Sequence, residues 1–458
     1  MPFIWDIKAF QINIKFYQKA KIQTRKILIP MERSNMQTAS GIYKKARRNV
    51  FSLTNISSYD ILIAELIYKY LMYWREIMFN INNYSKSVDF LLENAGPVIK
   101  YRLRKEILQD LAASEEEELL SQVYEMPLFK LLKTYIRPDG YIGNGMHSHD
   151  HWCEKTIHET PLQDGESAAR LLSYYKIPKS HPVVKNLVAA MRNEKILYKE
   201  FSHIPPEAVR FQNRFEGINN GNCLMALIYT MQAMLGYGDD YQDLKDFQQI
   251  SLKGFKHILE ISSLSEITKF NKESKLKYNY PYIEASEYFP NVYTLSMLAY
   301  TNNWRSKENL KIISDAFNHI NAIMEPGTNI HVRIKGRHIA PCGAFVRPVR
   351  PFNTGVIDII NYRRLLTEIA MAGADMETGI IRETADNING ALSKDGRLYM
   401  DFKQPHNRHY SPKYLKYPQP YTDVMLEASY SGKNNENALS CDLTFWALEF
   451  LFLAEKEN

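Results

Sequence analysis

Apolar positions along the chain fall into pairs of helix-length segments that are joined by short polar turns. In residues 165–192, an apolar helix is predicted up to Tyr175, followed by a turn and a second helix that begins at Pro182. Proline is favoured in the first turn of a helix, where its missing N–H leaves no hydrogen bond unmade. The segment therefore predicts a helical hairpin.

The same hairpin pattern recurs along most of the chain. The five predicted turns are spaced by 64, 60, 66 and 69 residues, and a further apolar helix over 440–454 would begin a sixth hairpin. Regular spacing of this kind is typical of helical-repeat folds. The other hairpins span residues 98–136, 221–259, 292–324 and 355–392, and the turns centre near Ser114, Pro178, Gly238, Trp304 and Gly373.

The two helices of each hairpin differ in polarity. The first is apolar on nearly all sides, whereas the second carries a single apolar stripe. All-round apolarity indicates a buried helix, and a single stripe indicates a covering one. We therefore predict an all-α fold, an α/α toroid of five to six hairpins of about 65 residues each. The toroid domain would span residues 58–458, after a basic N-terminal extension over residues 1–57.

Two finer features are expected of the toroid. A helix over residues 59–80 should pack against the helix at 440–454 and help to close the domain. Residues 329–334 alternate in polarity and predict one short strand, for which no second strand is evident as a partner.

Charge is distributed unevenly. The chain has a net charge of +6, but residues 1–57 contain eleven Lys/Arg and two Asp/Glu, so the remainder carries −3. The extension is a candidate for contact with an anionic surface or partner; the alternative is a poorly ordered or simply packed extension. The acidic remainder gives no strong nucleic-acid signal. Four scattered cysteines and the lack of a long apolar run favour a cytoplasmic protein.

Long connections return from each second helix to the next first helix. They span roughly residues 137–161, 194–219, 261–289, 326–353 and 393–422. In a toroid these connections would share one face, opposite the short turns. Loops of this length usually carry function, so this face should form the mouth of a central cavity.

Two of these connections concentrate positive charge. Residues 326–357 and 403–421 contain no Asp or Glu. Clustered guanidinium groups suit the recognition of phosphate or carboxylate, although solvated charge is the ordinary alternative for any single loop. We predict an anion site that includes Arg333, Arg337, Arg347, Arg350, Arg408, His409 and Tyr410.

The first long connection is rich in histidine. Four of the twelve histidines lie within residues 147–158. Imidazole beside a carboxylate suits general acid–base chemistry, and the candidate catalytic residues are His147, His149, Asp150, His158 and Glu159. A divalent metal such as zinc or magnesium is an alternative that we do not favour, because the spacing matches no known ligand pattern. Polar contacts that hold the loop in shape would also explain its many histidines.

Aromatic and acidic residues precede the predicted helix at 292. Aromatic faces beside carboxylates suit a sugar ring or a prenyl chain, and ordinary packing at a helix entrance is the alternative. The candidates are Tyr278, Tyr280, Tyr282 and Glu284. By contrast, Asp239, Asp240 and Asp243 match the DDxxD pattern of diphosphate–magnesium sites but fall in a short turn. There we expect aspartate to cap a helix rather than bind metal.

Three segments resemble repeats of the terpenoid cyclase and protein prenyltransferase toroid superfamily: RPDGYIG (137–143), ESAARLLSYYKIPKSHPVVKNLVAAMR (166–192) and LGYGDDYQDLKDF (235–247). The segments at 96–108 and 440–454 resemble an uncharacterised bacterial branch of these toroids. The resemblance implies the toroid fold. Neither family's catalytic set is present: there is no DxDD acid, and no aspartate lies two residues before Cys223 or Cys342.

These patterns predict a toroid whose central cavity binds an anionic small-to-medium substrate, such as an isoprenoid diphosphate or an acidic saccharide. As an enzyme it would resemble a transferase, a cyclase or a glycan-active enzyme. One alternative is a glycoside hydrolase or lyase of the α/α-toroid type, and the other is a non-catalytic binding scaffold.

Overall fold

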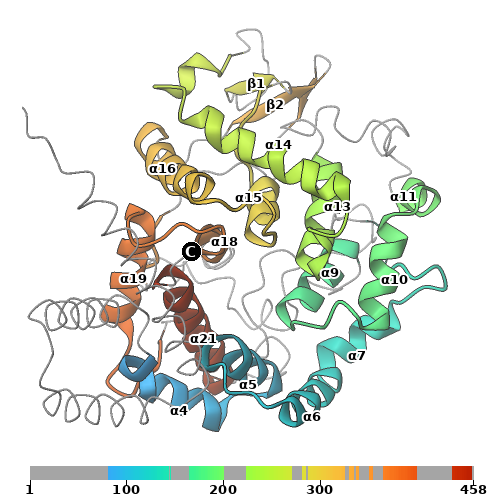
Figure 1. Cartoon of the computed structure of the whole chain (residues 1–458), viewed down its shortest axis with the longest axis vertical. Helices are drawn as coiled ribbons and strands as arrows, with labels where there is room; N and C mark the ends of the chain where they lie inside the picture. Colours follow the sequence, from blue (N-terminus) through green and yellow to red (C-terminus); the bar gives the residue numbers. More distant parts are fainter. Residues whose placement is uncertain are drawn as a thin grey trace, which may run out of the picture. The chain divides into compact units, whose positions relative to one another are not determined.

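Helices make up nearly all the regular structure in the computed structural model (Figure 1). All the described elements belong to one unit, residues 77–458. None of the described helices combines the length and apolarity that crossing a bilayer requires. The structure describes residues 81–143, 145, 164–200, 223–270, 281–284, 287–324, 330–334, 337–339, 350–353, 365–399 and 436–455.

The predicted hairpins are present. The first helices are α5 (Pro97–Arg102, continued by η2, Leu103–Leu108), α9 (Gly165–Tyr174), α13 (Cys223–Gln232, continued by η4, Ala233–Tyr237), α15 (Val292–Ala299) and α18 (Thr367–Met371). The second helices are α6 (Ala113–Tyr124), α7 (Pro127–Thr134), α10 (Pro182–Met191), α14 (Gln242–Ile258), α16 (Lys307–Ile323) and α19 (Gly379–Ala391). Around them lie η1 (Ile81–Tyr84), α4 (Ser85–Asn94), α11 (Glu194–Glu200), η5 (Leu264–Glu266) and α21 (Glu436–Glu455).

The first hairpin differs from its prediction in two places. Its turn lies at residues 109–112 rather than near Ser114, because Gln109 takes a left-handed conformation (φ 53°) that ends η2. Its second helix is split into α6 and α7, since Pro127 begins α7 and cannot continue α6.

Burial confirms the predicted difference between the two helices of a hairpin. Every residue of α15 is buried, and so are residues 165–173 of α9. The second helix α16 buries only five positions, all on one stripe: Ile313, Ser314, Ala316, Phe317 and Ile320. The first helices are thus enclosed, and the second helices cover them.

The first helices contact one another in chain order. Contacts join α9 to α13, α13 to α15, α15 to α18, and α18 to α21, and α21 also packs against α4, α5 and η2 (Figure 1). An ion pair between Lys176 and Glu106 (2.8 Å) joins the turn after α9 to η2. The predicted helix at 59–80, expected against α21, lies outside the described residues. Among the described elements, α4 and α5 are the N-terminal helices that pack against α21.

The short turns are linked to one another by the acidic turn residues. Lys179, in the turn after α9, pairs with Asp240 (2.8 Å) in the turn after η4. Asp239 accepts the backbone N–H groups of Asn302 and Asn303, both at 3.0 Å, in the turn after α15. The expectation that an aspartate caps α14 is wrong, because the N-cap residue is Tyr241 and makes no side-chain hydrogen bond to the helix. Asp239 instead accepts hydrogen bonds from the turn after α15.

Two Asp-Gly turns follow second helices and resemble each other closely. After α7, Arg137 N–H donates to Tyr141 O (2.8 Å), and after α19, Ser393 N–H donates to Arg397 O (3.0 Å). The glycines sit at φ +83° (Gly140) and φ +82° (Gly396), a conformation that side chains rarely adopt. Each turn packs on a neighbouring helix, Gly140 against α10 and Gly396 against α4.

The N-cap of α10 makes stability depend on pH. The neutral Nδ1 of His181 accepts the Val183 N–H (3.3 Å), and burial lowers the pKa of His181 below its ordinary 6.5. Protonation abolishes this acceptor. The stabilisation is therefore complete above pH 6.5 and is lost as the pH falls towards the lowered pKa of the folded state.

We expect His181→Ala to cost about 1 kcal/mol at pH 8. His181→Asn, which caps without titrating, should flatten the change in unfolding free energy between pH 8 and pH 5 relative to wild type. Urea titrations at both pH values measure this. An unchanged pH dependence in His181→Asn would show that another group is responsible.

Candidate functional site

A buried guanidinium lies among the first helices. Arg170 of α9 donates from Nε to Glu166 Oε1 (3.0 Å), one helical turn earlier. Its Nη1 lies 3.8 Å from Oε1 of Glu368, on α18. All three side chains are at most 2% exposed. The neighbouring carboxylates raise the pKa of Arg170 despite its burial, so the guanidinium stays charged.

Two more first helices contribute to this cluster. Ser296 of α15 donates to Glu368 Oε2, and Met234 of η4 places its Sδ 3.6 Å from Arg170 Nη1. Burial raises the pKa of Tyr300, at the end of α15, well above 10, with the charge of Glu368 adding to the effect. The cluster thus ties together α9, η4, α15 and α18 through polar contacts that water does not reach.

A second ion-pair group joins the N-terminal helices to α21. Arg102 of α5 lies 2.9 Å from Glu106 and also donates to Glu449 of α21. Its guanidinium stacks 4.9 Å from the Phe445 ring. Burial alone would raise the pKa of Glu106, but Arg102 and Lys176 outweigh that effect and lower it to about 2. This carboxylate is therefore ionised at neutral pH and acts as a permanent ion-pair partner.

The ends of the His-rich connection are fixed to the N-terminus of α9. Gly165 N–H donates to Gly145 O (3.1 Å), and Tyr141 Oη donates to the same oxygen (2.8 Å). Gly145 N–H donates to Glu200 Oε2 (2.7 Å), and Glu200 also pairs with Arg137. Burial raises the pKa of Tyr141 well above 10, so its phenol remains a hydrogen-bond donor. The connection over 146–163 thus starts and ends at neighbouring, hydrogen-bonded residues.

A three-stranded sheet joins two connections that the sequence analysis singled out. β1 (Tyr282–Glu284) pairs in parallel with β2 (His331–Ile334), which pairs antiparallel with β3 (Arg337–Ile339). The register sets Glu284 opposite Arg333 and Arg333 opposite His338. The strand expected within 329–334 is present as β2, and it has two partners that were not evident in the sequence. Its partners are only three residues long each, too short for alternating polarity to reveal them.

Carboxylates beside β1 are accessible. Glu284 is 32% exposed and lies 3.6 Å from Lys269 Nζ. Glu287, 40% exposed, lies 3.7 Å from His257 Nε2. Tyr282 is buried. The end of the Arg-rich connection is fixed too, since Phe352 N–H donates to Thr384 Oγ1 of α19 (3.2 Å).

The structure therefore brings together part of the predicted site. Tyr282, Glu284, Arg333 and Arg337 meet in one sheet, and Arg350 is an exposed residue two positions before Phe352. Within the described ranges, no cluster of three His, Cys, Asp or Glu is arranged for a metal ion. The other predicted residues lie outside the described residues: His147, His149, Asp150, His158, Glu159, Tyr278, Tyr280, Arg347, Arg408, His409 and Tyr410.

Sequence reasoning missed the buried cluster around Arg170. A signal was present, because Glu166 and Arg170 are spaced i, i+4 in an otherwise apolar helix, where isolated charges need partners. Glu368 gave no comparable signal, since its partner is distant in sequence.

The contacts of the cluster indicate a structural role. One guanidinium faces two carboxylates, and all three side chains are buried, so the cluster links the helices that carry them. It fixes the positions of four helices relative to one another, and long connections of the chain join these helices to the rest of the fold. The chain matches no protein-family model, no curated protein and no solved structure.

Proposed function

We propose that the chain is an α/α toroid that binds an anionic small-to-medium ligand at the end where the long connections gather. The pairing of β1 with β2 carries the proposal, because it joins the connection that contains Tyr282 and Glu284 to the Arg-rich connection over 326–353. A site assembled from separate connections is typical of functional faces on rigid scaffolds.

The toroid itself is supported by the order of contacts. The first helices from α9 to α21 contact their neighbours in chain order. The ion pair between Lys176 and Glu106 joins the second hairpin to the first, and the contacts of α21 with α5 join the last helix to the first hairpin. The short turns are linked in the same order.

The positive charges of the Arg-rich connection suggest which classes of ligand the site binds. An isoprenoid diphosphate or an acidic saccharide would place its anionic group beside Arg333 and Arg337, away from the carboxylates that surround Arg170. The hydrogen bonds of Gly145 and Phe352 fix one end of each of two long connections. A ligand that binds there would therefore cost less conformational entropy.

One alternative has a specific observation in its favour. Glu284 and Glu287 are both accessible, and Glu287 N–H donates to Glu284 O (3.0 Å), which keeps them on one turn. Two accessible carboxylates suit a glycoside hydrolase or lyase. In that case the carboxylates, rather than the arginines, would govern binding.

Thermal-shift measurements with pyrophosphate and with an oligogalacturonate distinguish these functions. A ligand at ten times its dissociation constant should raise the melting temperature by about 2 °C. The Arg333→Gln/Arg337→Gln variant should lose this shift, whereas Arg382→Gln, on the exposed side of α19, should keep it. A shift that survives the double variant but is lost in Glu284→Gln would favour the glycan-active alternative. The absence of any shift with either ligand would refute anion binding and leave the binding scaffold.

A further inference from the structure

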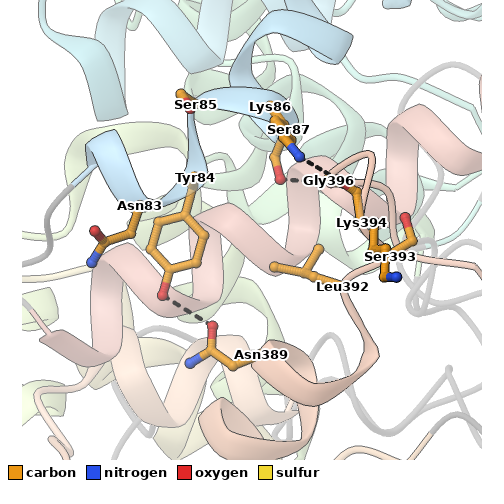
Figure 2. Close-up of a pocket in the computed structure, with 10 residues that line it drawn as sticks. All are labelled: Asn83, Tyr84, Ser85, Lys86, Ser87, Asn389, Leu392, Ser393, Lys394 and Gly396. Atoms are coloured by element: carbon orange, nitrogen blue, oxygen red, sulfur yellow. Dashed lines mark hydrogen bonds between the residues drawn. The ribbon is translucent and has the colours of Figure 1, made fainter.

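A pocket lies between the start of α4 and the Asp-Gly turn that follows α19 (Figure 2). Its volume is about 550 Å³, within the range of small-molecule sites. The pocket involves neither the β1–β2–β3 sheet nor the cluster around Arg170. It is therefore a separate feature, independent of the proposed function.

Hydrogen bonds fix both walls of the pocket. Tyr84 Oη donates to Asn389 Oδ1 (3.0 Å), and Lys86 Nζ donates to Lys394 O (2.7 Å), as Figure 2 shows. Ser87 Oγ donates to Gly396 O (2.5 Å). These bonds join α4 to α19 and its turn, so the pocket exists before any ligand arrives. A preformed pocket binds without a large ordering cost.

The lining has a distinct chemistry. Among the described residues that line it there are two lysines and no acidic residue, and Leu392 is the only aliphatic side chain. The other members offer hydroxyl and amide groups that both donate and accept hydrogen bonds. Such a lining suits a ligand with one strong negative charge and several hydroxyl groups, and it is too polar for an isoprenoid chain. The lining residues are Asn83, Tyr84, Ser85, Lys86, Ser87, Asn389, Leu392, Ser393, Lys394 and Gly396.

We propose that this pocket binds a sugar phosphate. Lys394, which is exposed at the rim and shares the pocket with Lys86, contacts the phosphate. Ammonium groups bind phosphate as compact point charges. The side chains of Asn83, Asn389 and Ser85 receive the sugar hydroxyls.

Calorimetric titration of the whole chain with glucose 6-phosphate tests the proposal, alongside glucose and inorganic phosphate. We expect glucose 6-phosphate to bind more tightly than either fragment. Lys394→Ala should weaken binding about five-fold or more, and Lys394→Arg should retain it. Lys133→Ala, which removes an exposed lysine from α7, should leave binding unchanged. Equal losses in Lys394→Ala and Lys133→Ala, or equal affinity for glucose 6-phosphate and phosphate, would overturn the proposal.

Lysine acetylation of the unmodified protein, read by mass spectrometry, gives a test that needs no variant. Glucose 6-phosphate should slow acetylation of Lys394 several-fold and leave Lys133 unaffected. Equal labelling of Lys394 with and without ligand would refute binding at this pocket. Because the sheet arginines are not involved, this outcome does not depend on Arg333 or Arg337.

Discussion

Replacing Arg170 with methionine should lower the free energy of unfolding by about 3–5 kcal/mol. The substitution keeps much of the side-chain volume but removes the charge that Glu166 and Glu368 share. Two carboxylates would then remain buried without the guanidinium, and this costs far more than the ion pair itself contributes. Urea denaturation followed by circular dichroism measures the loss.

The control is a triple variant in which Glu166→Gln and Glu368→Gln accompany Arg170→Met. Neutral amides remove the unpaired charge, so most of the lost stability should return. If the single and triple variants were equally unstable, packing rather than charge would explain the effect. A single-variant loss below about 1 kcal/mol would show that the guanidinium is not the partner of both carboxylates.

Replacing Gly396 with alanine should cost about 2–4 kcal/mol. Gly396 has φ +82°, and a Cβ there would lie 2.5 Å from Ser87 N and 2.7 Å from Lys86 C. Both atoms belong to the backbone of α4, so a side-chain rotation cannot relieve the contact. The helix would have to move away from the turn, breaking the hydrogen bond from Ser87 to Gly396.

Gly390→Ala is the matched control, six residues earlier in α19. No described atom lies within 4 Å of a Cβ at Gly390, and the position is helical. Alanine should therefore stabilise the protein by about 0.5–1 kcal/mol. Thermal denaturation of the two variants should shift in opposite directions. Equal melting temperatures would mean that the turn after α19 does not press against α4.

Local sequence patterns predicted the hairpins well. Proline starts α10, and the breaker residues between Tyr175 and Pro182 separate it from α9, so both boundaries are local signals. All-round apolarity predicted the burial of α15 and α21 equally well. The turn after η2 lies a few residues before its predicted position. It begins at one left-handed glutamine, a residue type with no strong preference for that conformation, so the sequence did not indicate it.

The candidate site was predicted only in part. Residue type alone indicated that Arg333 and Glu284 have binding chemistry, but their pairing is a matter of register between strands distant in sequence. The pocket between α4 and the turn after α19 had no sequence signal, because serine, asparagine and lysine are ordinary surface residues. Their meeting depends on hydrogen bonds that span most of the chain.

The sequence by itself determined an all-α chain of helical hairpins, the enclosed position of the first helices and the charge of the long connections. Those properties follow from period, propensity and composition, which act over a few neighbouring residues. The tertiary structure alone decided that Arg170 meets Glu368, that β1 meets β2, and that Asp239 serves a neighbouring turn. Each of these depends on how helices pack, where a buried charge or N–H takes whatever partner the packing brings within reach.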